Sequence, residues 1–443
     1  MTPALPIDPD PAPFAAKAEA VLPWRDPLAV AAGLRDAPGA VALLSDGAAG
    51  RSHVAAEPDA VWEGGEGFAS LARPGWRQGV VGLAAYDGGA RAATGPRPPA
   101  GDGWPDLTLA RYPARLRFDH AEQRLTAVGR GVDAASAHAA LERAVAFAEA
   151  AAAAAATTPA PPARAFVAES SDASYRAAVR DVVARIGSGE LFQANIARAW
   201  SGALNPGGDP FDVMLRLQAG RASAFGACWR LGDRSLVSNS PELFLTYDAA
   251  TGRIETRPIK GTRPRGADPI SDAREAETLR LSAKDRAENL MIVDLMRNDL
   301  ARVAQPGSVR VDRLFEIETL PTVHHLVSTV SGRAAPGVDA ADLLAAAFPP
   351  GSITGAPKRQ AMKVIAAHEP PRGAWCGALF HIDDDRRLTA SVLIRTASFR
   401  MSQGLWRFRA LAGAGITADS DPEAERLEVD AKIRALREAL SGA

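Results

Sequence analysis

The chain has 443 residues, a formal net charge of -1 and two cysteines. This length can bury one large core or two fused ones, and the balanced charge gives no field that would favour nucleic acid or an anionic membrane. Two cysteines do not make a disulfide framework, no apolar run reaches membrane-spanning length, and the first residues do not resemble a signal peptide. We therefore expect a cytoplasmic protein with no membrane or nucleic-acid partner.

The first third of the chain is a mixture of short apolar runs and Gly or Pro clusters. The runs at 41–44, 80–83 and 114–118 predict strands, and residues 134–156 predict an amphipathic to alanine-rich helix. The segment TTPAPP at 157–162 is typical of a linker. We therefore divide the chain into an N-terminal region at 1–156, a linker at 157–164 and a catalytic domain at 165–440.

The periodicity becomes clearer after residue 165. A helix is expected from Asp172, a plausible N-cap, to Ile186, and residues 191–198 alternate as a strand. Further strands are expected at 225–231, 235–238, 243–247, 253–257, 376–383, 388–399 and 406–413, and helices at 211–218, 272–280, 284–299, 339–347, 357–368 and 422–440. Antiparallel-type strands mixed with scattered helices favour a large α+β body. One arrangement left open is that each half of the chain supplies one sheet.

The segment PIKGTRPR at 258–265 places a single lysine, Lys260, in a turn-forming frame. The two prolines fix backbone angles, and Gly261 permits a positive φ. Lys260 follows Ile259, so it need not be fully solvated, and a desolvated lysine loses its proton more readily and becomes a nucleophile. The alternative is a surface turn whose basic residues aid solubility.

Two expected helices each carry spaced carboxylates. Asp285 and Glu288 are three residues apart, and Glu425, Glu428 and Lys432 follow the same face of the last helix. Together the two helices could hold a hard dication such as Mg²⁺, which takes one or two carboxylates plus oxygens of an anionic ligand. The competing interpretation is a pair of salt-bridged surface helices.

Several other residues suit an anionic substrate without a phosphate. The backbone N–H groups at Gly413 and Gly415 suit an anion, and Arg395, inside the apolar segment 388–399, needs a partner such as a carboxylate. His324 and His325 point to opposite sides of a strand, so at most one faces a site, where His325 could move protons. The alternative is that both histidines are structural.

These residues lie in motifs through which the chain resembles the chorismate-utilising enzymes. The motifs are GELFQAN at 189–195, SNSPELF at 238–244, PIKGTRPRG at 258–266, DRAENLMIVDLMRNDL at 285–300, PTVHHLVSTVSG at 321–332, FPPGSITGAPK at 348–358, RTASF at 395–399 and GAGITADSDPEAE at 413–425. Together they are specific and cover about residues 175–440. The N-terminal region matches more loosely, through Tyr86, Asp87 and WPD at 104–106.

The resemblance implies two large antiparallel sheets packed together with helices outside, chorismate as substrate and Mg²⁺ as cofactor. It implies Glu288 and Glu428 as metal ligands, supported by Asp285 and Glu425. The implied substrate contacts are Arg395, Gly413, Gly415, Lys432, Thr262 and Trp375. Trp375 stands where relatives often have tyrosine, which changes the hydrogen bond available there. His325 is implied to assist departure of the ring hydroxyl or proton transfer.

Two positions discriminate between reactions within the family. Isochorismate and salicylate synthases carry a lysine base where this chain has Gln193, and a glutamine cannot act as that base, so water addition is disfavoured. Anthranilate synthases have alanine where this chain has Lys260, whereas relatives that aminate the para position have lysine.

The resemblance thus implies para amination of chorismate to 4-amino-4-deoxychorismate through a Lys260 adduct at C2, for para-aminobenzoate and folate synthesis. Ammonia is expected from a glutamine amidotransferase subunit. Two alternatives remain: ortho amination to anthranilate, and a non-catalytic protein that binds nucleic acid through KGTRPR, which the balanced charge disfavours.

Overall fold

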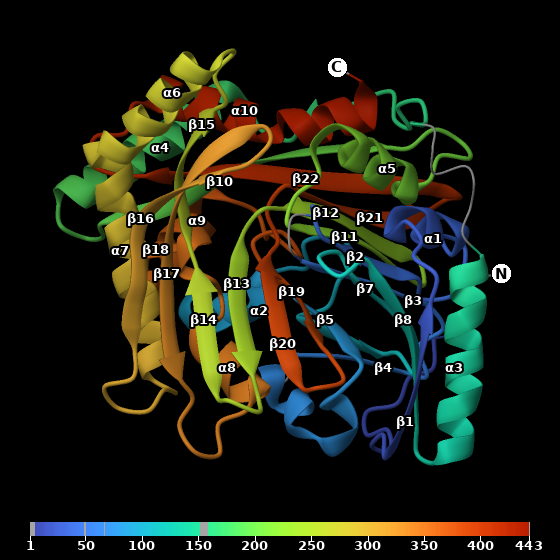
Figure 1. Ribbon diagram of the computed structural model, residues 1–443. Coiled ribbons are helices and arrows are strands. Elements are labelled where there is room, and N and C mark those ends of the chain that lie inside the picture. Colours follow the sequence, from blue (N-terminus) through green and yellow to red (C-terminus); the bar gives the residue numbers. More distant parts are fainter. Residues whose placement is uncertain (1–4, 48–49, 66, 151–157, 443) are drawn as a thin grey trace.

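The protein is built from two antiparallel sheets that carry helices on their outer faces (Figure 1). The structure is a computed structural model that describes residues 5–47, 50–65, 67–150 and 158–442. The expected α+β class and the packing of two sheets are confirmed. Within these ranges, no helix combines the length and apolar character that a membrane crossing needs.

The larger sheet has 12 strands. Its main path runs through β1 (Ala16–Leu22), β8 (Arg124–Gly131), β7 (Ala114–Asp119), β3 (Arg51–Ala55), β2 (Val41–Leu44), β11 (Phe225–Leu231), β12 (Arg234–Ser240), β21 (Thr396–Ser402), β22 (Leu405–Ile416), β10 (Gln193–Ala203) and β18 (Gly355–Ala356). The short strand β9 (Val167–Ala168) pairs with β10. The long β10–β22 ladder forms one wall of the site described below.

The smaller sheet has 10 strands. Its path runs through β15 (Ile259–Pro264), β17 (Val323–Arg333), β14 (Arg253–Arg257), β13 (Leu243–Asp248), β20 (Arg387–Val392), β19 (Ala378–Ile382), β5 (Val80–Ala84), β6 (Leu107–Arg111) and β4 (Ala60–Gly64), and β16 (Arg310–Thr319) pairs with β17. The arrangement in which each half of the chain supplies one sheet is wrong. The β2–β11 and β5–β19 ladders join N-terminal strands to later ones, because each apolar strand gains hydrogen bonds and buried surface there.

The helices follow from capping residues and apolar periodicity. They are α1 (Pro27–Gly33), α2 (Tyr86–Thr94), α3 (Ala134–Glu149), α4 (Asp172–Gly187), α5 (Pro210–Arg221), α6 (Pro269–Leu281), α7 (Ala283–Ala301), α8 (Ala340–Ala347), α9 (Lys358–His368) and α10 (Pro422–Ser441). Asp421 caps α10 as expected, whereas α4 is capped by Ser171 and begins at Asp172. Of the helix expected at 134–156, residues 151–156 lie outside the described ranges, as does Thr157 of the expected linker.

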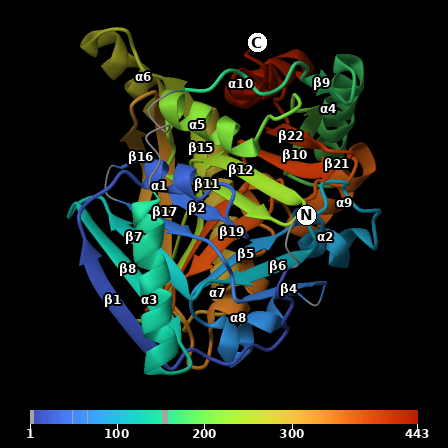
Figure 2. The same cartoon turned by 90° about the vertical axis from the view of Figure 1, so that its right-hand side faces the viewer.

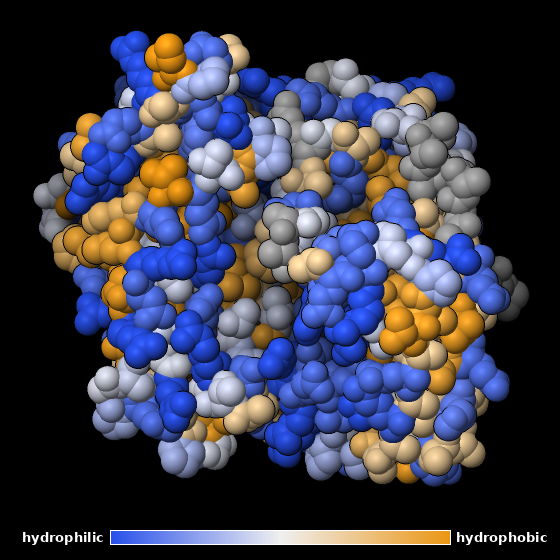
Figure 3. Space-filling view, viewed as in Figure 1, coloured by the Kyte–Doolittle hydropathy of each residue, from blue (hydrophilic) through white to orange (hydrophobic). Residues whose placement is uncertain are grey.

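Three clusters of buried residues hold the layers together. One joins α4, α5 and α10 to the larger sheet, and a second joins α7 and α8 to the smaller sheet. A third includes Trp104, Trp229 and Leu379. Figure 2 shows α10 and α4 at the same end of the molecule and α3 lying along β8. On the face shown in Figure 3, hydrophilic residues cover most of the surface and apolar residues show between them.

The expected strand at 388–399 is wrong as a single element. It is split into β20, in the smaller sheet, and β21, in the larger sheet. The chain must turn between the sheets there, and Arg395 adopts a positive φ of 51° in the turn. Beside it, the chain crosses in the opposite sense from β12 to β13, and the N–H of Asn239 donates to the carbonyl of Arg395 over 3.0 Å.

Candidate active site

A cavity of ≈ 120 Å³ lies where these two crossovers meet the β10–β22 ladder. Glu242, from the β12–β13 crossover, and Arg395, from the β20–β21 crossover, both line it. The remaining lining residues are Asn195, Ile259, Ser352, Ile353, Trp375, Cys376, Ile394, Leu411, Ala412, Gly413 and Lys432. Most of the expected substrate contacts therefore converge on one enclosed space.

Lys260 is not among the lining residues but lies beside the cavity, next to Ile259, which lines it. It belongs to strand β15 and not to a turn, and the register between β15 and β17 shifts between Ile259 and Thr262, which is a bulge. Gly261 within the bulge has the expected positive φ, 88°. The Lys260 ammonium nitrogen donates to the carbonyl of Ser352 over 3.1 Å. Burial lowers the pKa of Lys260 below its ordinary value, as the positive charge of Lys432 also does, although Glu288 opposes the shift.

Glu242 is a candidate catalytic residue that the sequence analysis did not single out. Its side chain is buried, and burial raises its pKa to about 7 although it accepts hydrogen bonds from the Ser352 hydroxyl and the Ile259 N–H. It also interacts electrostatically with Lys260. The signal was present in SNSPELF, where a carboxylate follows Pro241 between otherwise neutral residues. A carboxyl group that titrates near neutrality beside an amine can donate a proton during catalysis.

The glycines of β22 bring two amide side chains close to the cavity. A Cβ at Gly415 would lie 2.1 Å from Nε2 of Gln193 and 3.5 Å from Nζ of Lys260. A Cβ at Gly413 would lie 2.5 Å from Oδ1 of Asn195. The two glycines lie within β22 and not after it, and the β21 ladder ends at Ala410, so β22 continues to Ile416 beside β10.

Trp375 forms another part of the wall. It is buried, a Cβ at Gly413 would lie 3.1 Å from its ring, and its indole Nε1 is buried without a hydrogen-bond partner among the described residues. An indole N–H can only donate. The hydrogen bond that a tyrosine would make at this position can therefore be replaced by an indole donor.

The two adjacent histidines have different partners, and neither is among the residues that line the cavity. His324 contacts Thr319 and Asp272, at 2.9 and 2.8 Å, and is structural. His325 faces Thr262, whose hydroxyl lies 2.8 Å from Nδ1, and its Nε2 is buried without a partner among the described residues. Burial and the nearby charge of Arg395 lower the pKa of His325 to about 4, so its ring is neutral at pH 7.

The carboxylates on α7 and α10 form a rim that holds two lysines. The ammonium of Lys284 lies 3.7 Å from Glu425 and 4.0 Å from Glu288, so carboxylates from both helices surround one cation. Lys432 lies 2.7 Å from Glu428 and donates to the carbonyl of Gly413 over 3.0 Å.

Burial affects these carboxyl groups differently. It raises the pKa of Glu288 and of Glu425. Burial acts in the same direction on Glu428, but the charge and hydrogen bond of Lys432, together with the charges of Lys284 and Lys260, outweigh it and leave the pKa of Glu428 lowered. Asp285 pairs with Arg263 at 3.1 Å and lies beside the Cβ position of Gly261, and its charge contributes to the raised pKa of Glu288.

The rim has the donor chemistry that a magnesium ion needs. Its oxygens are carboxylates, and the Lys284 ammonium already occupies a position between two of them. Within the described ranges, no three His, Cys, Asp or Glu side chains stand close enough to form a preassembled metal site. Glu288, Glu425 and Glu428 are therefore the residues that could hold a metal after the lysines move.

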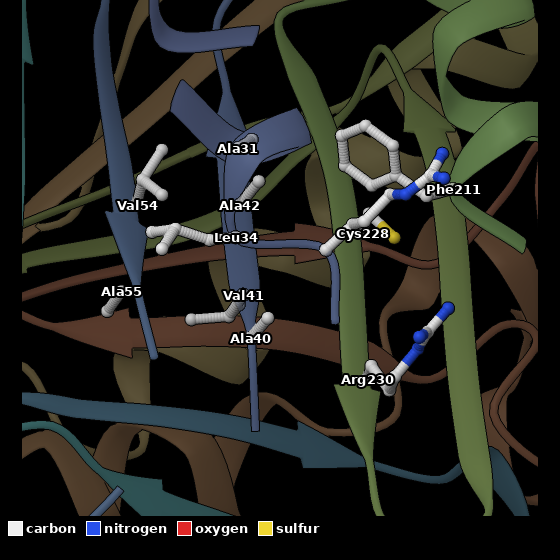
Figure 4. A pocket seen from close by; sticks show the side chains of 11 residues that line it. Ala31, Leu34, Ala40, Val41, Ala42, Val54, Ala55, Phe211, Cys228 and Arg230 are labelled. Carbon is white, nitrogen blue, oxygen red and sulfur yellow. The ribbon is translucent and has the colours of Figure 1, made fainter. Parts of the chain in front are cut away.

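Other cavities lie elsewhere. The small pocket in Figure 4, ≈ 10 Å³, is lined mainly by apolar residues, with Cys228 and Arg230 at one side. A cavity of ≈ 470 Å³ lies between β2, β11, β19 and β20 and is lined by His53 and His381 among others. Neither cavity is lined by any of the expected site residues.

Comparisons with known proteins find relatives over most of the chain. The family model described as chorismate binding enzyme matches residues 44–438. Aminodeoxychorismate synthase component 1 of Salmonella typhimurium is 40% identical over 358 residues, which cover 80% of this chain and 75% of that protein. Anthranilate synthase component 1 of Streptomyces coelicolor is 39% identical over 337 residues, 75% of this chain and 63% of that protein.

Solved structures share the fold. Anthranilate synthase component I from Streptococcus pneumoniae superposes with a TM-score of 0.71 at 26% identity, over 81% of this chain and 80% of that chain. The menaquinone-specific isochorismate synthase MenF from Escherichia coli has a TM-score of 0.76 at 18% identity, over 97% of this chain and 96% of that chain, which supports the fold alone. With a family model that matches nearly its whole length, the chain belongs to the chorismate binding enzyme family.

Proposed function

We propose that this protein aminates chorismate at C4 to give 4-amino-4-deoxychorismate. The observation that carries the proposal is a pair of side chains. Glu242 lines the cavity and its pKa is raised to about 7, and Lys260, whose pKa is lowered, donates to the carbonyl of Ser352, which also lines the cavity. Relatives named aminodeoxychorismate synthase component 1 support it. Identity alone does not decide, because an anthranilate synthase component 1 is 39% identical.

In the first displacement, neutral Lys260 attacks C2 of chorismate. The C1=C2 double bond moves to C1=C6 and the C5=C6 double bond to C4=C5, and the C4 hydroxyl leaves with its bonding electrons. Glu242 supplies the proton that converts this hydroxyl to water, and the attacking lysine nitrogen loses one proton. His325, neutral at pH 7, can hydrogen-bond the departing oxygen through Nε2.

In the second displacement, ammonia attacks C4 and both ring double bonds shift back. The C2–nitrogen bond breaks, and the lysine nitrogen leaves as the amine after it regains a proton. Two displacements place nitrogen para to the ring carboxylate, whereas a single attack at C2 gives the ortho amine. The side chains of Gln193 and Lys260 both lie close to Gly415, and Gln193 has no basic group that could activate water.

The remaining residues bind and orient the substrate in this proposal. Arg395 is a bidentate donor for one carboxylate, and the Trp375 indole donates to an acceptor in the same cavity. Glu288, Glu425 and Glu428 would hold Mg²⁺, which would supply a positive charge for the ring carboxylate. The lack of a Cβ at Gly413 and Gly415 lets the side chains of Asn195 and Gln193 lie close to the β22 backbone.

A second subunit is part of this proposal. The names of several relatives contain "component 1", which indicates a second component in those proteins. We propose that a glutamine amidotransferase subunit supplies ammonia to this chain. Glutamine-dependent product formation should then require the added subunit, whereas ammonium salts at high pH should replace it. Glutamine-dependent activity of the purified chain alone would contradict this part of the proposal.

A product assay tests the function directly. Purified protein with chorismate, Mg²⁺ and an ammonium salt should give 4-amino-4-deoxychorismate, identified by chromatography and NMR. Anthranilate as the product would instead establish ortho amination, which the similarity to anthranilate synthases makes the second candidate. Isochorismate as the product would contradict both.

A further inference from the structure

A buried arginine outside the catalytic set connects three parts of the cavity wall. Arg372 lies in the segment between α9 and β19, and its side chain is completely buried. Its guanidinium donates to both carboxylate oxygens of Glu369, at 2.8 and 3.0 Å. A buried bidentate pair of this kind has one strongly preferred geometry, because both groups lose hydrogen bonds if either moves.

The same guanidinium reaches two backbone carbonyls of the cavity wall. It donates to the carbonyl of Ile353 over 3.1 Å and to that of Asn195 over 2.6 Å, and both residues line the cavity. The carbonyl of Ser352, the residue before Ile353, accepts the hydrogen bond from Lys260. One arginine is thus linked to the acceptor that orients the proposed nucleophile.

Arg372 also supports the aromatic wall. Its guanidinium carbon lies 5.0 Å from the ring centre of Trp375 and 4.6 Å from that of Tyr86. Its partner Glu369 accepts from the N–H of Ala197 over 2.7 Å and so holds β10 a second time. A planar guanidinium can do this stacking and forked bonding together, which a lysine cannot.

The N-terminal region fixes the segment that carries Arg372 and Trp375. The N–H of Tyr86 donates to the carbonyl of Gly373 over 2.9 Å, and the N–H of Gly373 donates to Asp87 over 2.7 Å. Asp102 accepts from the N–H of Ala374 over 2.9 Å. These contacts leave the segment little freedom, so the position of Arg372 is determined from both sides.

We propose that Arg372 is a positioning residue for the reaction, which sets the Ser352 carbonyl, and through it Lys260, at a fixed distance from the Asn195 and Trp375 walls of the cavity. The inference rests on the proposed function for its kinetic consequence. Small displacements of reacting groups reduce rates strongly, by up to about 10²-fold for a shift of about 1 Å.

The chain offers a closely matched control, Arg111 in β6. Arg111 is also buried, bonds both oxygens of Asp59 at 2.9 and 2.8 Å, donates to two backbone carbonyls and lies over an aromatic ring at 4.2 Å. It does not line the cavity. Arg372→Lys and Arg111→Lys therefore disturb similar contact sets, and only the first disturbs the site.

The experiment compares these two variants in melting temperature and in kinetics with chorismate, Mg²⁺ and an ammonium salt. Both should lose similar stability, but only Arg372→Lys should reduce kcat, by about tenfold or more, with KM for chorismate changed much less. Equal kcat values for the two variants, at matched folded fractions, would overturn the proposal. If Arg372→Lys does not fold, Glu369→Gln replaces it, because the glutamine keeps an oxygen for the Ala197 N–H. This variant should show the same reduction in kcat with a much smaller change in KM.

A second readout does not depend on which reaction the protein catalyses. The rate of acetylation of Lys260 by acetic anhydride across pH, measured by mass spectrometry, reports the environment of its amine. Arg372→Lys should change this profile, and Arg111→Lys should leave it as in the wild type. An unchanged profile in both variants would overturn the positioning role, whereas failure of the product assay with an altered profile would overturn only the proposed function.

Discussion

Two groups of charged residues lie at the cavity, and they differ in the partners that hold them. Glu242 lies at the crossover wall and Lys260 beside it, where burial shifts both pKa values toward neutral forms. The carboxylates of α7 and α10 lie at the rim and are held in ion pairs with lysines. Burial also raises the pKa of Glu288 and Glu425 there, whereas Lys432 and Glu428 are about half exposed. Lysine and carboxylate side chains can thus do different chemistry at the two places. Those at the wall can exchange protons and form bonds, and those at the rim can bind and release cations.

Removing the proposed nucleophile, Lys260, should have the largest effect on activity. Lys260→Ala should reduce formation of the para amine by about 10³-fold or more, while chorismate still binds, because Lys432, another amine at the cavity, is held by Glu428 and the Gly413 carbonyl. Turnover with ammonium and chorismate binding by calorimetry check this. Lys363→Ala, at an exposed position on α9, is the control and should be normal. Unchanged turnover by Lys260→Ala would remove the covalent role.

Neutralising the acid should have the next largest effect. Glu242→Gln should lower kcat by about 10²-fold, because the departing hydroxyl then lacks its proton donor. In the wild type, kcat/KM should fall as pH rises through about 7, since Glu242 loses its proton there. The variant should lose this alkaline limb. A variant that keeps both its rate and its pH profile would show that another group supplies the proton.

A change at the rim should alter the metal requirement more than the chemistry. Glu288→Gln should raise the Mg²⁺ concentration for half-maximal activity by about tenfold or more, because the substitution replaces a negatively charged carboxylate with a neutral amide. A Mg²⁺ titration measures this, and Glu277→Gln in α6, which breaks an exposed pair with Arg280, is the matched control. Superimposable titrations for wild type and Glu288→Gln would argue against a ligand role.

The smallest effect is expected at the aromatic wall. Trp375→Phe removes one buried donor and should raise KM for chorismate by about three- to tenfold, the equivalent of one hydrogen bond. Trp104→Phe is the comparison, because its Nε1 is also buried without a described partner but it does not line the cavity. Similar KM changes in both variants would indicate a general packing effect and not a lost substrate contact.

The sequence predicted many of the elements and site residues. It missed others, such as the strands β15, β16 and β17, and features that depend on the packing of distant segments. Lys260, Arg395, Gly413, Trp375 and Lys432 were all expected at the site, and they line or border one cavity. Their roles in the reaction and the metal site stay predictions. The α+β class was predictable because periodicity and turn residues are local signals.

The errors have a common physical cause. Periodicity cannot show that the apolar segment at 388–399 passes from one sheet to the other at Arg395, because both halves read as strand. Glu242 lies at the companion crossover, and its raised pKa arises from burial by residues distant in sequence. Arg372 was missed for the same reason, since its partners Asn195 and Ile353 come from separate segments.

Mass spectrometry of the Lys260 peptide tests the central claim most directly. The protein is incubated with chorismate and Mg²⁺ without ammonium, quenched in acid and digested. Lys260 should carry chorismate less one water, and ammonium added before the quench should discharge the adduct as 4-amino-4-deoxychorismate. Formation of that product while Lys260 never gains mass would contradict the account.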